Sequence, residues 1–449
     1  MKCKAVLAWL AMVACVTAPT VGCSTRSNAG STIDVINWWT EDGEYQAMDS
    51  LIALFEATYP NQDVFNGYVQ GAPAARTKIR EQVIAGFPPE TFQANGGWDL
   101  LSWVAYNKKD AKDRKLEPLD TYATWQSAIP APVLDAVRFQ GTIYAVPLNI
   151  HRLNVLFFNK RVFLDNDIPL PTSDSLKTLD DLFALCDALR GNEALASKQV
   201  RPIALAAREP SWLSLYLFEN ILVARAGGAA YRDYFRGNVD SLTWPPLRTA
   251  IEDLTKLLSY DPAAHDRDWD DAVDEMREGR AAMTIMGDWT KGYIDNKPEP
   301  VQYDAIPTPG TGSTFVFTTD TFGLTYGAGN RDGALKLLDV FGSSQGQNEF
   351  NVVKGSIPAR TDADLLRFTG TSRQTIADFY DAVAGDRVTL VPATSILAPP
   401  DYMDAIFKLL TAYAANDGAG AGNMSVLLTG LKNRSDVLRN NAKIWSYGD

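Results

Sequence analysis

Histidine and usable cysteine are scarce in this chain of 449 residues. It has two histidines, and two of its four cysteines lie in an N-terminal segment with the features of a removable leader. A third, Cys23, follows that segment directly, so Cys186 stands alone in the body of the protein. Metal sites use clustered His, Cys and carboxylate ligands, and a disulfide needs two thiols. We therefore expect no metal, no cofactor and no internal disulfide.

Positive charge and long apolar runs are also lacking. The formal net charge is −12, and no stripe of Lys and Arg gathers in any segment. Because such a chain repels phosphate backbones, we expect no nucleic-acid partner. Beyond the N-terminal segment, no stretch approaches the ~18 uncharged apolar residues of a membrane-spanning helix. The body of the protein is therefore expected to be soluble.

The familiar enzyme motifs are missing as well. The chain contains no G-x-S-x-G loop, no Walker loop and no dinucleotide-binding glycine pattern after a strand. The stretch from Asp266 to Asp270 begins like a calcium loop. It has Asp271 where that loop needs Gly and Arg277 where it needs Glu. We interpret it as a solvated loop or a helix start, and we expect the protein not to be an enzyme.

The N-terminal segment predicts export. Lys2 and Lys4 precede an apolar run over residues 5–18, which is too short to span a membrane. Residues 20–23, Thr-Val-Gly-Cys, resemble the lipobox of bacterial lipoproteins, with Thr20 in place of the usual Leu. We expect a signal peptide over residues 1–22, lipidation of Cys23 and a flexible tether over residues 23–31. A plain signal peptide cut nearby is the alternative.

The body of the chain alternates strand and helix patterns. Residues 33–39 and 64–69 have the pattern of strands, and helical spacing of apolar residues covers 44–59 and 76–85. The pattern breaks near residues 143–149 and again near 304–310, as if the chain passes from one sheet to another. We predict a two-lobed α/β protein of the periplasmic-binding-protein type, with a hinge and a ligand cleft between the lobes. Residues 32–146 and 305–345 are assigned to lobe 1, and residues 147–304 and 346–449 to lobe 2.

Cys186 is expected to be an inert core thiol. Residues 178–190 place Cys186 on one helical face with four apolar side chains. Thr178 and Asp181 have the spacing of a capping box, and Gly191 suits the end of the helix.

Tryptophans follow two of the expected strands. Trp38 and Trp39 close the first strand, and Trp289 follows Asp288 at the end of another. In parallel sheets, ligands bind beyond the carboxyl ends of strands. An indole can cover the C–H face of a pyranose while carboxylates and amides bind its hydroxyls. The composition favours a sugar site, with core packing as the alternative for each indole. Packing is favoured for Trp98, Trp103, Trp125 and Trp445.

Six stretches, in order along the chain, carry a family resemblance. They are Trp38-Trp39-Thr40 with Glu44, residues 88–93 (PPETFQ), residues 146–152 (VPLNIHR), Trp212 with residues 217–219 (LFE), residues 283–289 (MTIMGDW) and residues 354–360 (KGSIPAR). Together they resemble the bacterial family 1 extracellular solute-binding proteins, in the glucose/mannose-binding branch. The resemblance implies a monomeric receptor that closes on a sugar and delivers it to the permease subunits of an ABC importer.

The resemblance also implies which residues bind. Trp38 or Trp39 would stack on the sugar ring, and hydroxyls would be bound by Glu44, Gln93, Asn149 and Asp288. Further ligand-binding candidates are His151, Trp212, Trp289, Asp320 and Lys354. Beyond core packing for the indoles, the candidates have these structural alternatives: a hinge histidine for His151, a helix cap for Asp288, lobe core for Trp212 and Asp320, and a helix-end partner for Lys354.

One position departs from the family pattern. Members that bind glucose carry a His shortly before an Ala-Pro pair near the C-terminus, and Ser395 stands at about that place here. Ser has a shorter reach than His, so glucose itself is in doubt, and a larger or modified glycoside could use the space.

Two other functions stay open. Glu41, Asp42 and Glu44 could supply, with Asp288, the carboxylate pair of a secreted glycoside hydrolase. A sugar sensor for a membrane receptor would share the fold and the site of a transport receptor.

Overall fold

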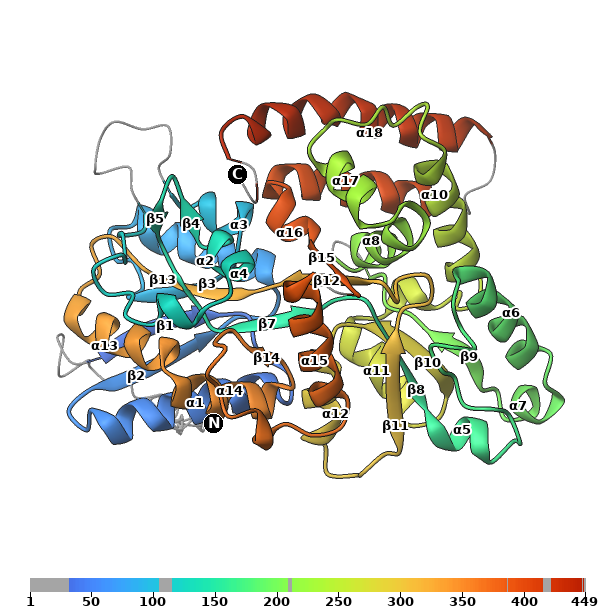
Figure 1. Ribbon diagram of the computed structural model, residues 1–449, viewed down its shortest axis with the longest axis horizontal. Coiled ribbons are helices and arrows are strands. Elements are labelled where there is room, and N and C mark those ends of the chain that lie inside the picture. The colour runs from blue at the N-terminus through green and yellow to red at the C-terminus, as the bar shows by residue number, and fades with distance from the viewer. Residues whose placement is uncertain are drawn as a thin grey trace, which may run out of the picture.

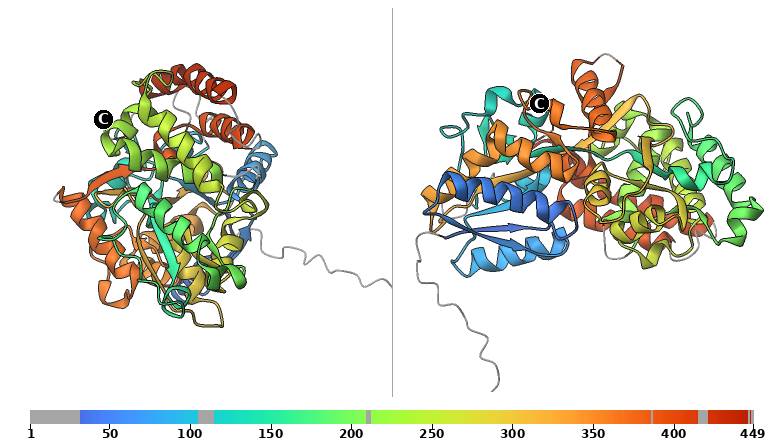
Figure 2. Two further views of the ribbon diagram at one scale, coloured as in Figure 1. Left: turned by 90° about the vertical axis from the view of Figure 1, so that its right-hand side faces the viewer. Right: turned by 90° about the horizontal axis from the view of Figure 1, so that it is seen from below.

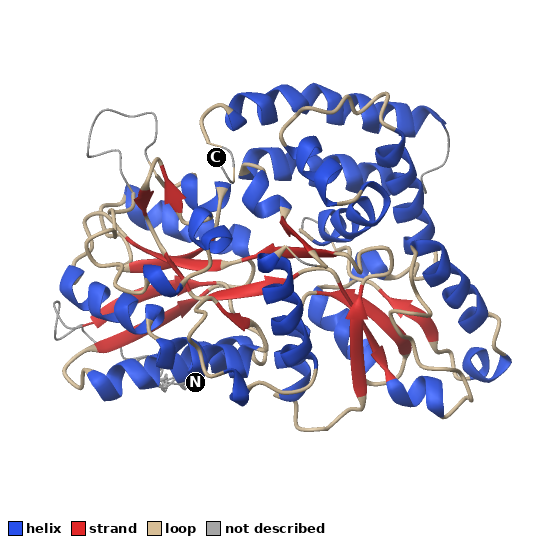
Figure 3. Cartoon of the chain, in the orientation of Figure 1, coloured by secondary structure: helices blue, strands red, loops and turns tan. Residues whose placement is uncertain are grey.

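A computed structural model describes residues 32–104, 115–208, 212–385, 387–414, 421–445 and 447. The predicted signal peptide, Cys23 and the tether lie outside these residues. Two α/β lobes lie side by side along the long axis of the molecule and are joined across its middle (Figure 1, Figure 2). The three larger sheets follow the same division, one in each lobe and one between them (Figure 3). Within the described ranges, every helix is too short or too polar to cross a lipid bilayer.

The first lobe is built on a five-stranded sheet. Its order is β2 (Asp63–Tyr68), β1 (Thr32–Asn37), β3 (Thr91–Asn95), β13 (Asp320–Leu324) and β6 (Val146–Pro147). β1 runs parallel to β2 and β3, whereas β13 is antiparallel to β3 and β6. Helix α1 (Glu44–Thr58) confirms the helix predicted for residues 44–59. Helix α2 (Ala72–Ile84) begins four residues before its predicted start, with Pro73 in its first turn.

The second lobe has a four-stranded sheet of its own. The order is β11 (Tyr303–Pro307), β8 (Val155–Asn159), β10 (Ala281–Met286) and β9 (Arg201–Ala204). Around it lie, among others, α6 (Leu179–Arg190), α8 (Leu213–Ala226), α11 (Trp269–Arg277) and α12 (Trp289–Asp295). The capping box of Thr178 and Asp181 is present, and Cys186 is fully buried. Burial raises the pKa of the Cys186 thiol to about 12, so the prediction of an inert core thiol is confirmed.

A third sheet connects the lobes. It contains β14 (Ile357–Pro358), β7 (Asn149–Arg152), β12 (Thr314–Thr318) and β15 (Thr389–Pro392). β7 leads from β6 of lobe 1 to β8 of lobe 2, and β12 returns from β11 to β13. The chain passes to lobe 2 once more through β15 and α16 (Thr394–Leu397). The first passage agrees with the predicted one, whereas the second comes later because residues 303–307 still pair with β8.

Two hydrophobic cores divide the helices. Phe350 and Phe379 lie in the core of the first sheet, so α14 (Ser344–Lys354) and α15 (Thr371–Ala384) pack with lobe 1. Residues 346–449 are predicted for lobe 2, and only the later part, with α17 (Pro400–Ala414) and α18 (Ala421–Ala442), contributes to the second core. The assignment to lobe 2 is wrong for α14 and α15, because an apolar helix face does not indicate which of two sheets the helix covers. The division into lobes that move against each other stays a prediction.

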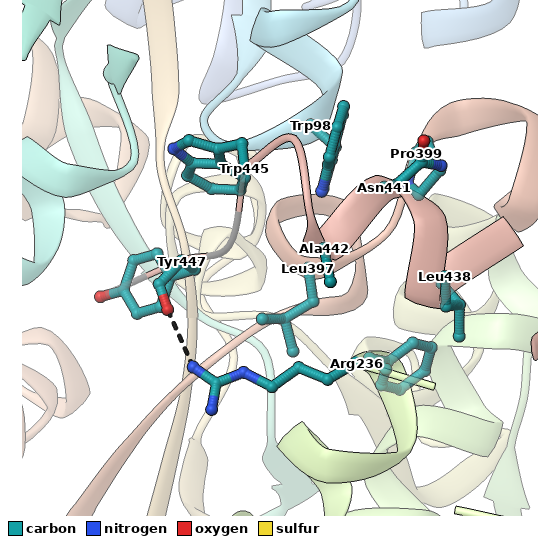
Figure 4. Close-up of a pocket in the computed structure, with 10 residues that line it drawn as sticks. Trp98, Arg236, Leu397, Pro399, Leu438, Asn441, Ala442, Trp445 and Tyr447 are labelled. Atoms are coloured by element: carbon teal, nitrogen blue, oxygen red, sulfur yellow. Dashed lines mark hydrogen bonds between the residues drawn. The ribbon is translucent and has the colours of Figure 1, made fainter. Parts of the chain in front are cut away.

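The C-terminal segment reaches back from lobe 2 to lobe 1. The Trp445 indole N–H donates to the backbone carbonyl of Arg138 at 3.2 Å, and the Tyr447 hydroxyl donates to that of Pro132 at 2.9 Å. Arg236 of lobe 2 donates to the Tyr447 carbonyl at 3.2 Å. Arg236, Trp445 and Tyr447 line a small pocket, where Trp445 stands edge-on to Trp98 with ring centroids 5.8 Å apart (Figure 4). The end of the chain therefore bridges the lobes.

The backbones of the lobes also meet at three glycines. Gly43 precedes α1 with a φ of 78°, and Gly355 follows α14 with a φ of 80°. Both face Gly292 of α12 in lobe 2. A Cβ built on Gly43 would lie 2.5 Å from the carbonyl carbon of Gly292, and one built on Gly292 would overlap the carbonyl group of Lys354. Only glycine permits this approach between the lobes.

We expect Gly292→Ala to lower the free energy of unfolding by about 1–3 kcal/mol, because the added methyl group forces the lobes apart. Alanine within a helix ordinarily gives a gain of up to about 1 kcal/mol over glycine, so the sign is diagnostic. Urea unfolding of the purified variant measures it. Gly312→Ala is the control, since its Cβ would meet no atom within 4 Å. A Gly292→Ala protein as stable as the wild type would show that the lobes are not held at this contact.

Candidate functional site: a polar network between the lobes

A buried histidine joins the two lobes. His151 lies on β7, Asp288 follows β10 of lobe 2, and Asp320 opens β13 of lobe 1. The His151 Nδ1 atom is 2.5 Å from Asp288 Oδ1, and Nε2 is 3.2 Å from Asp320 Oδ2. The three residues are 3%, 4% and 4% exposed. One imidazole therefore bridges a carboxylate of each lobe.

Electrostatics favour the charged form of this histidine. Burial by itself lowers the pKa of His151, but the charge of Asp288 and the hydrogen bonds to Asp288 and Asp320 outweigh it, and the net pKa is raised. Burial alone would raise the pKa of Asp320, yet His151 and more distant Lys354 bring it below its ordinary value. The raised pKa favours an imidazolium between the two carboxylates, an arrangement in which buried charge is tolerable.

Amide side chains extend the network into lobe 1. The Asn149 side chain donates to Asp320 Oδ2 at 2.8 Å and accepts from the Asp320 backbone N–H at 2.9 Å. Gln93 Nε2 donates to Asp320 Oδ1 at 2.9 Å, and Gln93 Oε1 accepts from the backbone N–H of Trp38 at 3.0 Å. The structure therefore brings together five of the predicted polar residues, from β3, β7 and β13 and from the position after β10.

Asp288 does not cap the helix that follows it. It occupies the N-cap position of α12 but makes no side-chain cap hydrogen bond. Its second oxygen instead accepts the backbone N–H of Arg152 at 2.9 Å. The structural alternative of a helix cap is therefore wrong, and the carboxylate serves the lobe junction.

Lys354 and Glu44 form an ion pair at the edge of the network. The lysine is 2% exposed at the end of α14, and its Nζ binds Glu44 Oε1 at the start of α1. The same Nζ lies 5.7 Å from the ring centroid of Trp39 and 6.0 Å from that of Trp289. Lys354 therefore has the contacts of the structural partner that was the alternative to ligand binding.

The paired tryptophans after β1 differ in burial. Trp39 is 1% exposed and packs on Phe350 and Phe322, with centroid distances of 4.9 and 5.7 Å. Trp38 is half-buried, and the guanidinium of Arg76 lies 5.4 Å from its ring centroid. Of the two, Trp38 has the accessible surface that stacking on a ligand requires.

Lobe 2 presents an aromatic group beside His151. Trp289 stands edge-on to His151 at 5.1 Å, and Trp212 and Trp269 stand edge-on to Trp289 at 5.9 and 6.4 Å. All three indoles are half-buried. Packing is confirmed for Trp98, Trp103 and Trp125, which are buried, and half-buried Trp445 packs on Trp98.

Sequence reasoning missed Trp269 and Asp270. The stretch before them does form a helix start, as predicted, with Asp268 and Asp271 in a capping box. Asp270, however, is half-buried: burial and then the charge of Glu41 in lobe 1 raise its pKa to about 6. The signal that could have found it is Trp269 itself, an indole at a helix start.

Ser395 is the residue that departs from the family pattern. It is half-buried on α16, and its Oγ is 3.2 Å from Thr318 Oγ1. Thr318 is the β12 partner of His151. Among the described residues, no group of three or more His, Cys, Asp or Glu is arranged to hold a metal ion.

Comparison with known proteins decides the family. Residues 51–378 match the family model described as bacterial extracellular solute-binding protein. The chain belongs to this family. An uncharacterised ABC transporter extracellular-binding protein of Pyrococcus horikoshii is 31% identical over 94% of this chain and 91% of its own length. A probable sugar-binding periplasmic protein of Rhizobium meliloti is 27% identical over 86% of this solute-binding protein and 90% of its own length.

A solved structure confirms the fold of the solute-binding protein. The bacterial solute receptor AcbH, described as having an exclusive substrate preference for β-D-galactopyranose, superposes with a TM-score of 0.75 at 16% identity. The match covers 91% of this chain and 100% of AcbH. The predicted two-lobed fold is therefore confirmed.

We expect His151→Gln to lower the free energy of unfolding of this solute-binding protein by about 3–5 kcal/mol, because two buried carboxylates lose their cation. The free energy of unfolding that the raised pKa of His151 contributes is fully present below about pH 6.5, and it is lost as pH rises through the folded-state pKa. Asp320, with a lowered pKa, contributes above about pH 3.9 and loses this as pH falls. The stability difference should therefore be largest between these values and shrink as pH rises through the folded-state pKa of His151.

Urea unfolding between pH 4.5 and 9 measures this difference. His265→Gln is the control, since His265 is exposed at the surface of lobe 2. A difference that stays constant over the whole range would contradict an imidazolium at the junction.

Proposed function

We propose that this protein is an exported receptor that binds a neutral monosaccharide or short glycoside between its lobes and delivers it to an ABC importer. The observation that carries the proposal is the grouping of half-buried indoles from both lobes, Trp38 on one side and Trp212, Trp269 and Trp289 on the other, around a polar network. Indoles cover the apolar face of a sugar, and the carboxylates and amides nearby match its hydroxyls. The named sugar-binding relatives support the same ligand class.

Binding would act through hinge closure. The strands β7 and β12 connect the lobes, and only a closed protein offers contacts from both of them to one ligand. A micromolar dissociation constant corresponds to about 8 kcal/mol, which a few stacked and charge-assisted contacts can supply after the cost of ordering. The closed form would then dock on the permease.

The small Ser395 beside Thr318 favours a ligand that extends past a single glucose at that edge. The serine hydroxyl is shared with Thr318, so a glycoside substituent reaching this edge would meet two hydroxyls. Export by the predicted signal peptide and anchoring through Cys23 would hold the receptor, as a monomer, at the outer face of the membrane.

The carboxylates favour binding over hydrolysis. Asp288 is engaged with His151, Glu44 with Lys354 and Asp42 with Lys297. A glycoside hydrolase needs one carboxylic acid free to protonate the leaving group and a second carboxylate at a set separation. Each of these three groups already has a basic partner, so Glu41, whose pKa is raised chiefly by burial, is left as the only one of the four candidates to fill both roles. We therefore propose that the protein is not an enzyme, and that incubation with chromogenic aryl glycosides releases no product.

Thermal unfolding against glucose, mannose, galactose, xylose, maltose, trehalose and glucosylglycerol tests the proposal. A bound sugar at a hundred times its dissociation constant adds about 2.7 kcal/mol and should raise the unfolding midpoint by several degrees. The shift should vanish in Trp212→Ala, which removes the indole next to Trp289.

Trp244→Ala is the matched control for this measurement. Trp244 is also a half-buried indole of lobe 2, but it stacks on Tyr234 at 5.6 Å, among helices of that lobe. Its variant should keep the full ligand-induced shift. A wild-type protein that no sugar stabilises, or an equal loss in both variants, would sink the proposed site.

A further inference from the structure

Arg76 lies over a half-buried indole that follows β1 of lobe 1. It is on α2 of lobe 1, and its guanidinium carbon is 5.4 Å from the ring centroid of Trp38. The side chain of Arg76 is 17% exposed, and Trp38 is half-buried. The backbone N–H of Trp38 belongs to the network of Gln93 and Asp320. The Trp38 backbone is therefore linked through Gln93, by two hydrogen bonds, to Asp320 at the lobe junction.

A buried carboxylate fixes the plane of this guanidinium. Asp99, in the first turn of α3 (Trp98–Leu101), accepts Arg76 Nε–H at 2.9 Å and Nη2–H at 2.7 Å. Asp99 is fully buried and also accepts the backbone N–H of Asn95 at 3.0 Å. The guanidinium has five N–H groups, and Asp99 takes two of them. Nη1, with two more, makes no hydrogen bond to the described residues.

The same helix offers an instructive comparison. Arg80, one turn further along, also lies over an indole, 5.5 Å from the ring centroid of Trp103. Trp103 is buried in the lobe core, and Arg80 is exposed. A stacked arginine on α2 is thus compatible with simple cover of an indole. What distinguishes Arg76 is the buried carboxylate that orients it and the half-buried indole beneath it.

Given the proposed function, we propose that Arg76 is a specificity-determining residue of the sugar site. Its Nη1 edge binds two adjacent hydroxyls of a sugar that contacts Trp38. A planar guanidinium presents its N–H groups side by side, so it suits two neighbouring oxygens. Asp99 orients this edge before any ligand binds, which reduces the ordering cost of binding.

The ligand class follows from the charges. Asp99 already balances the charge of Arg76. The lobe junction also holds the buried carboxylates of Asp288 and Asp320. A uronate would add another negative charge. Arg76 therefore selects a neutral sugar with a free vicinal diol.

Isothermal titration of the full chain tests this with D-glucose, D-galactose, maltose and the monodeoxy derivatives of whichever binds the wild type most tightly. Arg76→Met keeps the apolar stem and removes the donors, and we expect it to weaken that sugar about ten- to hundredfold. Arg76→Lys should recover only part of this, because a lysine lacks the planar edge. Arg80→Met, the matched control, should stay within about twofold of the wild type.

The deoxy sugars separate a ligand contact from a structural role. Wild-type protein should lose affinity for the two derivatives that lack either partner hydroxyl, whereas Arg76→Met should bind these as well as the parent sugar. Equal weakening of all sugars by Arg76→Met, or an unchanged affinity, would overturn the assignment of Arg76 while leaving the receptor in place. Wild-type protein that binds none of these sugars would overturn the sugar receptor and, with it, this assignment.

Discussion

The junction of this molecule depends on one imidazole held between carboxylates of different lobes. The raised pKa of His151 favours the cation that offsets burying Asp288 and Asp320 together, and Asp320 in turn holds the amides of Asn149 and Gln93. Each of these groups would be costly to bury alone. Because the strand β7 that carries His151 is itself a connection between the lobes, the electrostatics and the hinge occupy the same few residues.

Much of this could be predicted from the sequence, because the relevant signals are local. Strand and helix periodicity identified the alternating elements, and the capping box of Thr178 and Asp181 marked a helix start that the structure contains. The motif residues from Gln93 to Asp320 do meet at the lobe junction. Whether they contact a sugar stays a prediction, since the structure shows only their contacts with one another.

What the sequence could not provide are pairings over long separations. Nothing local shows that α14 packs with α1, nearly three hundred residues earlier, or that Asp99 orients Arg76. Burial likewise distinguishes Trp38 from Trp39, although adjacent residues of one type look alike in a sequence. The sequence predicts a solvated Asp270, because acids that neighbour one another usually are solvated. The charge repulsion between Asp270 and Glu41 arises only when the lobes meet.

The shared core of the first and later parts of the chain has a consequence for how the protein is made. The core beneath β1 also contains Phe350 and Phe379, so it cannot close until most of the polypeptide has been synthesised. Contacts of such long sequence separation form slowly, because the loop entropy must be overcome first. The nascent N-terminal part therefore waits without its full core. A chain that stays incompletely folded for this long is well suited to being threaded across a membrane before it becomes compact.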